Sequence, residues 1–400
     1  MTKLLIYSHA FAPKIGGVET LVMSLAKGLS GRQSGETSPN PQVTVVTRTP
    51  RGAFDDNSLT FRIVRRPSLA QLLYLLGAAD VVHLGGPAFL PLLLGRLLGK
   101  PVVVEHSGYQ AICPNGLLLD ERSKTACPGH FMCGRYGECV RCNAANGAWG
   151  RSLAMLLLAF PRHWMCEKVA RNVVPSAHVG DRLALPGTMT IYHGVPKARS
   201  FPLPVRPRFA SPVSFAYVGR LVSEKGLNLL LASARRLYGT GCSFRLKFIG
   251  DGPERSRLEA AVDASGLRSR VDFTGYLQGE DLEKELKDVT AVVMPSIWEE
   301  TAGLAALEHM MRGRMVIAAD IGGLKELVDG TGLKFRPGDI DGLTRCMKRV
   351  LDEPAHARAL GENAKKRAEE AFPEERMLAE HLTLYNQLVK PTAAPPRLPV

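Results

Sequence analysis

The sequence has no apolar run long enough to cross a bilayer, which takes about 20 consecutive apolar residues. Its longest candidates are short or are interrupted by polar residues, proline or arginine, and they span residues 69–76, 88–98 and 153–160. The N-terminal segment MTKLLIYSHAFAP also lacks a small-residue cleavage site, which favours a first β-strand over a signal peptide. We therefore expect a cytoplasmic protein.

The chain has fewer acidic than basic residues. It contains 38 Asp and Glu and 51 Lys and Arg, so its formal net charge is +13. This excess favours anionic partners such as nucleotides, phosphorylated glycans, acidic membrane surfaces or nucleic acid, and it does not choose among them. A hydrophobic content of 45% over 400 residues is typical of a globular protein with two domains.

Short runs rich in β-branched residues alternate with longer helical patterns, which predicts parallel βαβ units. Most runs are continuously apolar, as expected for strands that are covered on both faces. The expected strands are KLLIYS, QVTVVT, DVVHLG, PVVVEHS, NVVPS and TIYHG in the first half, and VSFAYVG, FRLKFIG, VDFTG, TAVVMPS and MVIAAD in the second. The predicted fold class is therefore α/β, with two doubly wound, Rossmann-like domains.

One stretch rich in Pro and Arg sets the predicted domain boundaries, and we interpret this stretch, residues 196–212, as a linker. It separates an N-terminal domain, 1–195, from a C-terminal domain, 213–372. A C-terminal helix that packs back on the N-terminal domain is expected over 373–390, and a disordered tail over 391–400. Two doubly wound domains on one linker would place a ligand cleft between them, at the carboxyl ends of both sheets.

Glu300 and Glu308 flank a small, apolar stretch in WEETAGLAALEH. Their spacing along a helix corresponds to roughly 12 Å of rise, so the two carboxylates cannot share one proton or one metal. The helix that carries Glu308 would offer the amides of its first turn to a phosphate. Glu308 would then accept hydrogen bonds from the hydroxyls of a ribose, while Glu300, in the loop before the helix, would face a reacting sugar.

Two other loops in the second half suit a phosphate or a flat ligand. Arg220 and Lys225 follow a strand in YVGRLVSEKG, and a diphosphate calls for such a bidentate fork and point charge. In FIGDGPE, Gly250 and Gly252 would let the backbone lie close to a base, although the same pattern is typical of a plain turn.

Five motifs together give a resemblance that covers nearly the whole chain. They are APKIGGVET, YVGRLVSEKG, FIGDGPE, PSIWEETAGLAALEHM and DIGGLKELVDGTGLKFRPGD. In this combination the chain resembles the retaining glycosyltransferases of family 4. The resemblance implies a two-domain fold of the GT-B type, a nucleotide-sugar donor bound mainly by the second domain, and transfer with retention of the anomeric configuration.

The resemblance also assigns roles to single residues. It implies that His106, in VVVEHSG, and Glu300 are catalytic residues that face the transferred sugar. In YHGVP, His193 stands where the family often has Asn. The residues implied to bind the donor are Gly16, Gly17, Arg220, Lys225, Gly250, Tyr276, Ala302, Gly303, Leu304 and Glu308.

The chain departs from the family pattern at two places. Arg314 and Met315 stand where the family usually has Gly-x-Pro, and Thr301 and Ala302 stand where Pro-Phe or Gly-Phe is common. We expect these changes to alter the wall of the donor pocket without removing a charged residue assigned to the donor.

The predicted function is transfer of a hexose or related sugar from a UDP-, GDP- or ADP-sugar to a glycan or glycolipid acceptor, in polysaccharide or lipopolysaccharide biosynthesis. Cations and helix amides would stabilise the leaving diphosphate, so no cofactor or metal is expected for catalysis. The helical segment 150–171 suits an anionic membrane surface, although a buried helix explains it equally well.

Two alternatives stay open. One is a nucleotide-sugar epimerase on the same fold, which would act on the donor alone. The other is a non-enzymatic, basic, cysteine-rich binding protein, although the donor loops argue against nucleic acid as a partner.

Five of the eight cysteines fall in an expected insertion of the N-terminal domain, about 110–145. In a reducing cytoplasm, a C-x-x-C with further thiols nearby is typical of a structural zinc site. An iron–sulfur cluster, a disulfide-bonded loop and unligated thiols are alternatives. The predicted zinc ligands are Cys127, Cys133, Cys139 and Cys142, with Cys113 or His130 as a substitute.

Overall fold

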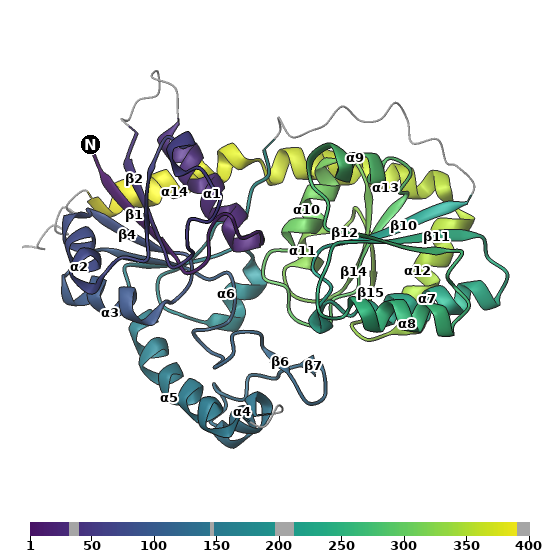
Figure 1. Cartoon of the computed structure of the whole chain (residues 1–400), viewed down its shortest axis with the longest axis horizontal. Coiled ribbons are helices and arrows are strands. Elements are labelled where there is room, and N and C mark those ends of the chain that lie inside the picture. The colour runs from purple at the N-terminus through teal and green to yellow at the C-terminus, as the bar shows by residue number, and fades with distance from the viewer. Residues whose placement is uncertain (32–39, 145–147, 197–211, 390–400) are drawn as a thin grey trace, which may run out of the picture. The chain divides into compact units, whose positions relative to one another are not determined.

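The computed structural model describes residues 1–31, 40–144, 148–196 and 212–389, which belong to two compact α/β units. All strand pairs of the two large sheets are parallel, so the predicted fold class is confirmed (Figure 1). The described parts of the first unit come from 1–116, 149–193 and 374–389, and those of the second from 117–148 and 194–373.

Two of the expected segments fall on undescribed residues. The expected linker, 196–212, lies outside the described residues except at its two ends, and the expected tail, 391–400, lies wholly outside them. Among the helices in the described part of the chain, none has the length and apolar content needed to span a membrane.

The sheet of the first unit has seven strands in the order β3-β2-β1-β4-β5-β8-β9. Its strands are β1 (Lys3–Ser8), β2 (Gln42–Thr47), β3 (Arg62–Arg65), β4 (Val81–Leu84), β5 (Val102–Glu105), β8 (Arg171–Val174) and β9 (Thr188–Thr190). The sequence did not predict β3, because its four residues RIVR place charge at both ends. The last strand ends at Thr190, where the predicted run TIYHG begins.

Two helices of the first unit begin at serine caps. The side chains of Ser68 and Ser176 accept hydrogen bonds from backbone N–H groups in the first turns of α2 and α6. The helices are α1 (Gly17–Ser30), α2 (Leu69–Ala78), α3 (Phe89–Leu97), α5 (Trp149–Cys166), α6 (Ala177–Leu183) and α14 (Glu374–Val389), and a 3₁₀ turn, η1, spans Asp56–Ser58.

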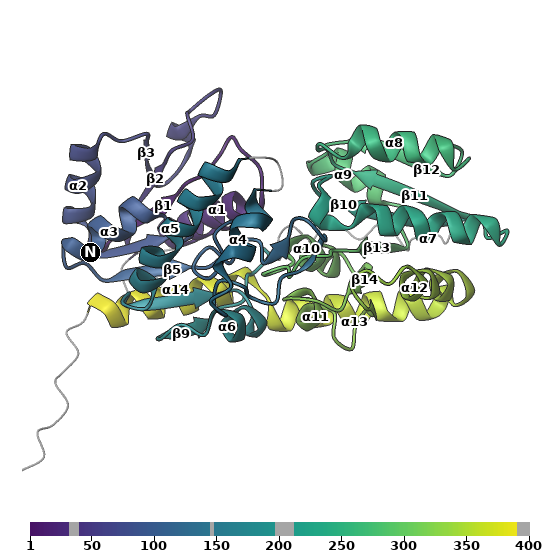
Figure 2. The same cartoon turned by 90° about the horizontal axis from the view of Figure 1, so that it is seen from below.

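The last helix, α14, completes the core of the first unit. It packs beside α1 (Figure 2) and contacts β4. A Cβ atom on Gly28 of α1 would lie only 2.4 Å from Leu378, so glycine permits this close approach. Met377, Leu384 and Tyr385 join the buried cluster around Leu25.

The sheet of the second unit has six strands in the order β12-β11-β10-β13-β14-β15. Its strands are β10 (Val213–Val218), β11 (Phe244–Ile249), β12 (Val271–Gly275), β13 (Ala291–Met294), β14 (Met315–Ala319) and β15 (Leu333–Phe335). Helices lie on both of its faces, with α7 beside α12 and α10 beside α13 (Figure 1). The helices are η3 (Ser223–Lys225), α7 (Leu227–Gly239), α8 (Arg255–Ala264), α9 (Gly279–Leu286), α10 (Leu304–Met311), α11 (Leu324–Leu327), α12 (Ile340–Asp352) and α13 (Pro354–Ala371).

Most of the cysteine-rich segment, from Leu117 onward, groups with the second unit, whereas the sequence placed it in the first domain. It contains the antiparallel pair β6 (Leu119–Asp120) and β7 (Thr125–Ala126), followed by α4 (Tyr136–Asn143). Arg122 joins these parts, because its Nη2 atom donates to Asp120 Oδ2 at 3.1 Å and to Glu138 Oε2 at 2.7 Å.

Candidate functional site

Glycines bring the backbones together at the carboxyl ends of β10, β11 and β12. The Gly219 amide donates to the Ile249 carbonyl at 3.0 Å, and the Gly250 amide donates to the Gly275 carbonyl at 2.8 Å. Gly250 has a φ of +139°, and a Cβ atom there would lie 1.9 Å from the Gly219 oxygen. Only glycine fits this position, and a flat ligand could lie against the side-chain-free surface.

The loop after β10 is fixed against the end of β13. Gly226 is left-handed, and a Cβ atom on it would lie 2.0 Å from the Pro295 oxygen. The Ile297 amide donates to the Glu224 carbonyl at 3.1 Å. These contacts hold η3, which carries Lys225, next to the loop that carries Glu300.

Lys225 and Glu300 form an ion pair at this position. Lys225 Nζ lies 2.5 Å from Glu300 Oε1, and Ser296 Oγ donates to the same oxygen at 2.6 Å. The lysine ammonium also lies 5.5 Å from the centroid of the Trp298 ring. The sequence assigned Lys225 and Glu300 to separate parts of a ligand and did not predict that they pair, because they lie 75 positions apart.

The carboxylate of Glu300 is buried but stays ionised. Burial alone would raise its pKa, yet the charge of Lys225 and the hydrogen bonds from Lys225 and Ser296 outweigh burial and lower the pKa. The Glu300 backbone is held as well, because its carbonyl accepts from the Gly323 amide at 2.6 Å. A Cβ atom on Gly322 would lie 2.3 Å from that carbonyl, so the glycine pair after β14 belongs to the site.

Arg220 is the exposed cation of the site. Its side chain is 71% exposed and lies 4.0 Å from Glu224, a weak interaction that leaves the guanidinium available to an anion. The Tyr217 hydroxyl donates to the Arg220 carbonyl at 2.8 Å and thereby fixes the backbone below it.

The helix α10 carries the other predicted donor residues. Gly303, its N-cap, has a φ of 65° and no side chain that could cap the amides of Leu304 and the next residues. Glu308 is 35% exposed on the same helix, with Arg312 3.9 Å away. Burial, and then the charge of Glu308, raises the pKa of Tyr276, which therefore lies near that carboxylate.

The remaining predicted residues lie in the first unit. Gly16 is the N-cap of α1 in an extended conformation, and Gly17 begins that helix. His106 is fully buried after β5, and its Nε2 atom lies 2.8 Å from Asn172 Oδ1. Burial lowers the pKa of His106 to about 4.

Asn172 defines the tautomer of His106 and was missed by the sequence. Its Nδ2 atom donates to the carbonyls of Cys166 and Pro186, each at 2.9 Å, so its oxygen faces the histidine. The His106 Nε2 atom therefore carries the proton. The Nδ1 atom is a hydrogen-bond acceptor that finds no partner among the described residues.

The prediction that Arg314 and Met315 alter the wall of the donor pocket is wrong. The Arg314 Nη1 atom donates to the Val289 carbonyl at 2.7 Å, which lies just before β13 begins. Met315 begins β14 and belongs to the core. Both residues therefore lie at the amino ends of the strands, opposite the carboxyl ends where the donor residues gather.

The four predicted zinc ligands are placed in the cysteine-rich segment, and three of them are buried. Cys139 and Cys142 lie on α4, and Cys133 is exposed. Cys142 Sγ accepts from the Glu121 amide at 3.3 Å, and Cys127 Sγ accepts from the Gly129 amide at 3.4 Å. In the part of the chain that the structure describes, no three cysteine sulfurs lie within 4.8 Å of one another. The zinc site stays a prediction.

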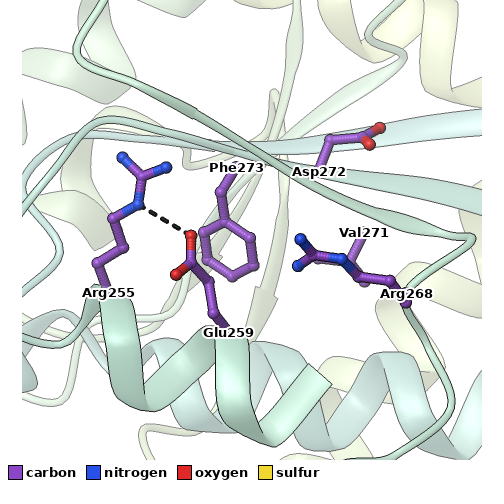
Figure 3. A pocket seen from close by; sticks show the side chains of 6 residues that line it. All are labelled: Arg255, Glu259, Arg268, Val271, Asp272 and Phe273. Atoms are coloured by element: carbon purple, nitrogen blue, oxygen red, sulfur yellow. Dashed lines mark hydrogen bonds and ion pairs between the residues drawn. The ribbon is translucent and has the colours of Figure 1, made fainter. Parts of the chain in front are cut away.

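A hollow on the edge of the second sheet lies apart from these residues. It is formed by α8 and β12 and contains none of the predicted donor residues (Figure 3). Arg255 Nε donates to Glu259 Oε1 at 2.9 Å across one side of it. The lining residues are Arg255, Glu259, Arg268, Val271, Asp272 and Phe273.

Comparison with known families gives a match over the second unit. Residues 206–367 match the family described as "Glycosyl transferases group 1". This range contains Arg220, Lys225, Glu300 and Glu308. The match covers less than half of the chain, and it shows that this part is similar to that family.

Two similar proteins have the names of sugar transferases. The chain is 37% identical over 151 residues to 2-deoxystreptamine glucosyltransferase from Streptomyces kanamyceticus, a match that covers 37% of this chain and 38% of that protein. It is 29% identical over 282 residues to alpha-D-kanosaminyltransferase from the same organism, covering 70% of this chain and 69% of that protein. The first match thus spans well under half of that relative's length.

Solved structures share the fold over nearly the whole chain. Sucrose-phosphate synthase from Thermosynechococcus elongatus has a TM-score of 0.74 at 22% identity, covering 97% of this chain and 99% of that one. Anabaena HepE in complex with UDP has a TM-score of 0.71 at 17% identity, covering 97% and 100%. The chain therefore has the GT-B glycosyltransferase fold.

Proposed function

We propose that this chain is a retaining glycosyltransferase of group 1, which moves a hexose or related sugar from a nucleotide-sugar donor to a glycan or glycolipid acceptor. The observation that carries the proposal is the Lys225–Glu300 pair, an ammonium and a buried carboxylate joined beyond the carboxyl ends of parallel strands. Ligands of doubly wound folds bind at these ends. Arg220, in the loop after β10, and Glu308, on α10, belong to the same unit.

In this proposal the second unit holds the nucleoside diphosphate. Arg220 offers a bidentate fork, and Lys225 keeps N–H donors besides the one that faces Glu300. The first-turn amides of α10 add an anion site, and Glu308 accepts hydrogen bonds from ribose hydroxyls. Because HepE structures contain UDP and UDP-glucose, UDP-sugars come first among the UDP-, GDP- and ADP-sugar candidates.

The proposed chemistry uses Glu300 and His106 on the transferred sugar. Glu300 is ionised and fixed, so it can orient the sugar and stabilise positive charge that develops at its anomeric carbon. The resemblance assigns His106 to the same sugar, and its available Nδ1 acceptor supports that role. Since Arg220 and Lys225 offset the charge of the leaving diphosphate, the proposed reaction needs no metal ion.

We also propose that the enzyme is cytoplasmic and meets its acceptor at an anionic membrane surface through α5. Along this helix Trp149, Leu153, Leu157, Phe160 and Trp164 recur at helical spacing and are each at least 40% exposed. Arg96 lies against the Trp164 ring, 5.5 Å from its centroid, and supplies positive charge at the edge of this stripe.

A donor screen tests the proposed function. Full-length protein is melted with UDP-, GDP- and ADP-sugars in turn, and the true donor at about 100 times its dissociation constant should add about 2.7 kcal/mol of stability. That donor is then incubated with candidate acceptors, and proton NMR of the product should show the anomeric configuration of the donor. The Glu308→Ala variant, melted at the same donor concentration, is the matched control and should gain less stability.

Three results would contradict the proposal at different levels. No stabilisation by any nucleotide sugar would remove donor binding altogether. Isomerisation of the donor without an acceptor would identify an epimerase. An inverted product would leave a glycosyltransferase but reject retention.

A further inference from the structure

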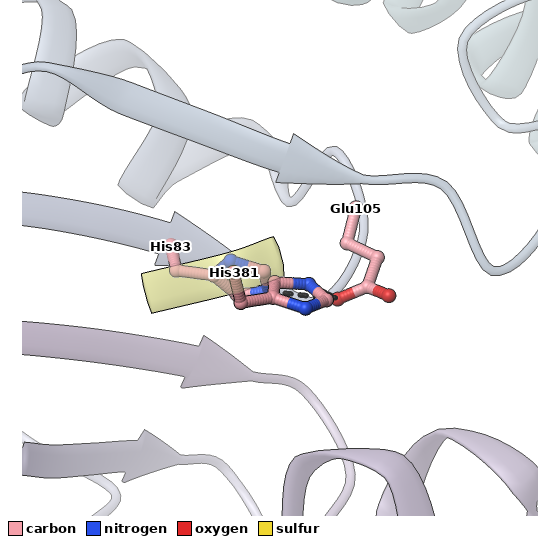
Figure 4. Close-up of side chains that lie close together, drawn as sticks. All are labelled: His83, Glu105 and His381. Carbon is pink, nitrogen blue, oxygen red and sulfur yellow. Dashed lines mark ion pairs between the residues drawn. The ribbon is translucent and has the colours of Figure 1, made fainter. Parts of the chain in front are cut away.

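A cluster of ionisable side chains is buried in the first unit, apart from every residue assigned to the donor. His83 at the end of β4, Glu105 at the end of β5 and His381 on α14 place three potential metal-binding atoms within 4.8 Å of one another (Figure 4). All three side chains are fully buried. Among the described residues, this is the one group of three potential metal ligands that meets this distance.

The distances between the atoms suit a bound ion. His83 Nε2 lies 3.0 Å from Glu105 Oε2, and His381 Nε2 lies 3.6 Å from the same oxygen. Donor atoms around a tetrahedral zinc ion, with bonds of about 2.0–2.1 Å, lie roughly 3.3–3.4 Å apart. The observed pair distances lie on either side of this value.

The contacts within the cluster have poor hydrogen-bond geometry. His83 Nε2 and His381 Nε2 lie within ion-pair distance of Glu105, yet neither these nitrogens nor the two Glu105 oxygens form a hydrogen bond of good geometry with a described residue. Buried polar atoms are rarely left in this state without an ion or a water. A cation bound by both nitrogens and Glu105 Oε2 would satisfy three of these four atoms.

The outer nitrogens of both histidines are already fixed. His381 Nδ1 lies 2.9 Å from the Met377 carbonyl, which can only accept, so this nitrogen carries the proton. In the neutral ring the lone pair is then on Nε2 and faces Glu105. His83 Nδ1 lies 2.9 Å from the Tyr385 hydroxyl. Such outer contacts are the usual way in which proteins orient metal-binding histidines.

We propose that His83 Nε2, Glu105 Oε2 and His381 Nε2 bind a structural divalent transition-metal ion, for which zinc is the best match. His193 Nε2 lies 3.3 Å from the second carboxylate oxygen, Glu105 Oε1, and a water is the expected fourth ligand. The ion would tie α14 to the ends of β4 and β5. It would also fix the strand end that leads into His106, so it acts on the proposed site by positioning and not by contact.

Metal analysis tests the proposal. Full-length protein purified without an affinity tag and dialysed after exposure to Zn²⁺ should retain about one ion that the His381→Gln and Glu105→Gln variants lack. The His309→Gln variant removes another buried histidine and should keep the ion. The Cys139→Ser, Cys142→Ser double variant should lose any ion that the cysteines bind. It should keep the ion that depends on the histidines.

Spectroscopy of that double variant identifies the ligands without depending on a variant of the cluster. X-ray absorption at the zinc edge should show nitrogen and oxygen neighbours at about 2.0 Å and no sulfur at about 2.3 Å. Removal of the ion with a chelator should lower the melting temperature, and Zn²⁺ should restore it. A wild-type protein that retains no ion, folded His381→Gln protein that retains as much as wild type, or a shell of sulfur alone would each overturn the proposal.

Discussion

The two α/β units share one strand order and use it differently. In chain order, each sheet begins with strands arranged 3-2-1-4-5, the order of doubly wound nucleotide-binding folds. The second unit gathers Arg220, Lys225 and Glu308 on loops and a helix beyond its strands, where solvent reaches them. The first unit instead buries Glu105 among histidines and exposes apolar side chains on α2, α3 and α5. One scaffold thus presents the candidate ligand site in one unit and anchors the C-terminal helix in the other.

The largest effect should come from Glu300, where the second unit concentrates its chemistry. We expect Glu300→Gln to lower turnover by about 100-fold or more, the usual cost of losing one transition-state contact. Donor affinity should change far less, because the amide keeps the size of the side chain. Steady-state kinetics and donor titration separate the two quantities. Glu280→Gln, on the exposed start of α9, is the matched control, and equal small effects from both variants would refute the role of Glu300.

Lys225 tests whether the charges of the second unit also stabilise it. Lys225→Met leaves Glu300 buried without its cation, and removing one partner of a buried pair costs about 3–5 kcal/mol. Since 18% of the lysine side chain is exposed, we expect Lys225→Met to lower the free energy of unfolding by about 2–3 kcal/mol, measured in urea. The Lys225→Met, Glu300→Gln double variant should recover much of this loss. A double variant as unstable as the sum of the single variants would mean that the pair contributes nothing.

The Lys225→Met variant should also change how activity depends on pH, in a direction set by the pKa of Glu300. In the wild type the lowered pKa of Glu300 gives stability that is present above the pKa of the unfolded chain and is lost as pH falls through the folded pKa. In Lys225→Met burial acts with less opposition, so the pKa of Glu300 should rise. The acid limb of the rate profile should therefore move to higher pH. An unchanged acid limb would show that another group titrates there.

Glu308 separates donor binding from chemistry within the second unit. Glu308→Ala removes an acceptor for ribose hydroxyls and should weaken donor binding by about 1.5–3 kcal/mol, as for a hydrogen bond to a charged group. Turnover at saturating donor should fall much less. Isothermal titration with the donor and with the free nucleoside diphosphate measures this directly. If donor affinity is unchanged, the ribose contact is not made by Glu308.

The same contrast explains what could be read from the sequence. Arg220 and Lys225 share one loop, and Gly303 and Glu308 share one helix, so short motifs contained most of the second unit's candidate site. The Lys225–Glu300 pair required the fold, because it joins the ends of two different strands. His83, Glu105 and His381 belong to three elements without a common motif, and no sequence pattern indicates that they meet. The position of Arg314 was misjudged because sequence proximity to Glu308 does not tell which end of a strand a residue occupies.

The smallest effect belongs to the exposed stripe on α5, and it concerns location and not chemistry. Leu157 is 61% exposed and lies near the middle of the stripe, so insertion of its side chain among lipids should contribute about 1 kcal/mol. Leu157→Glu also adds a negative charge at an anionic surface. We expect about 5- to 10-fold weaker binding to anionic vesicles in flotation assays, with turnover on a soluble acceptor unchanged. Ser256→Glu, at an exposed position on α8 of the second unit, adds the same charge and is the control. If Leu157→Glu and Ser256→Glu weaken binding equally, the surface is electrostatic and general, and the apolar stripe of the first unit is not the membrane contact.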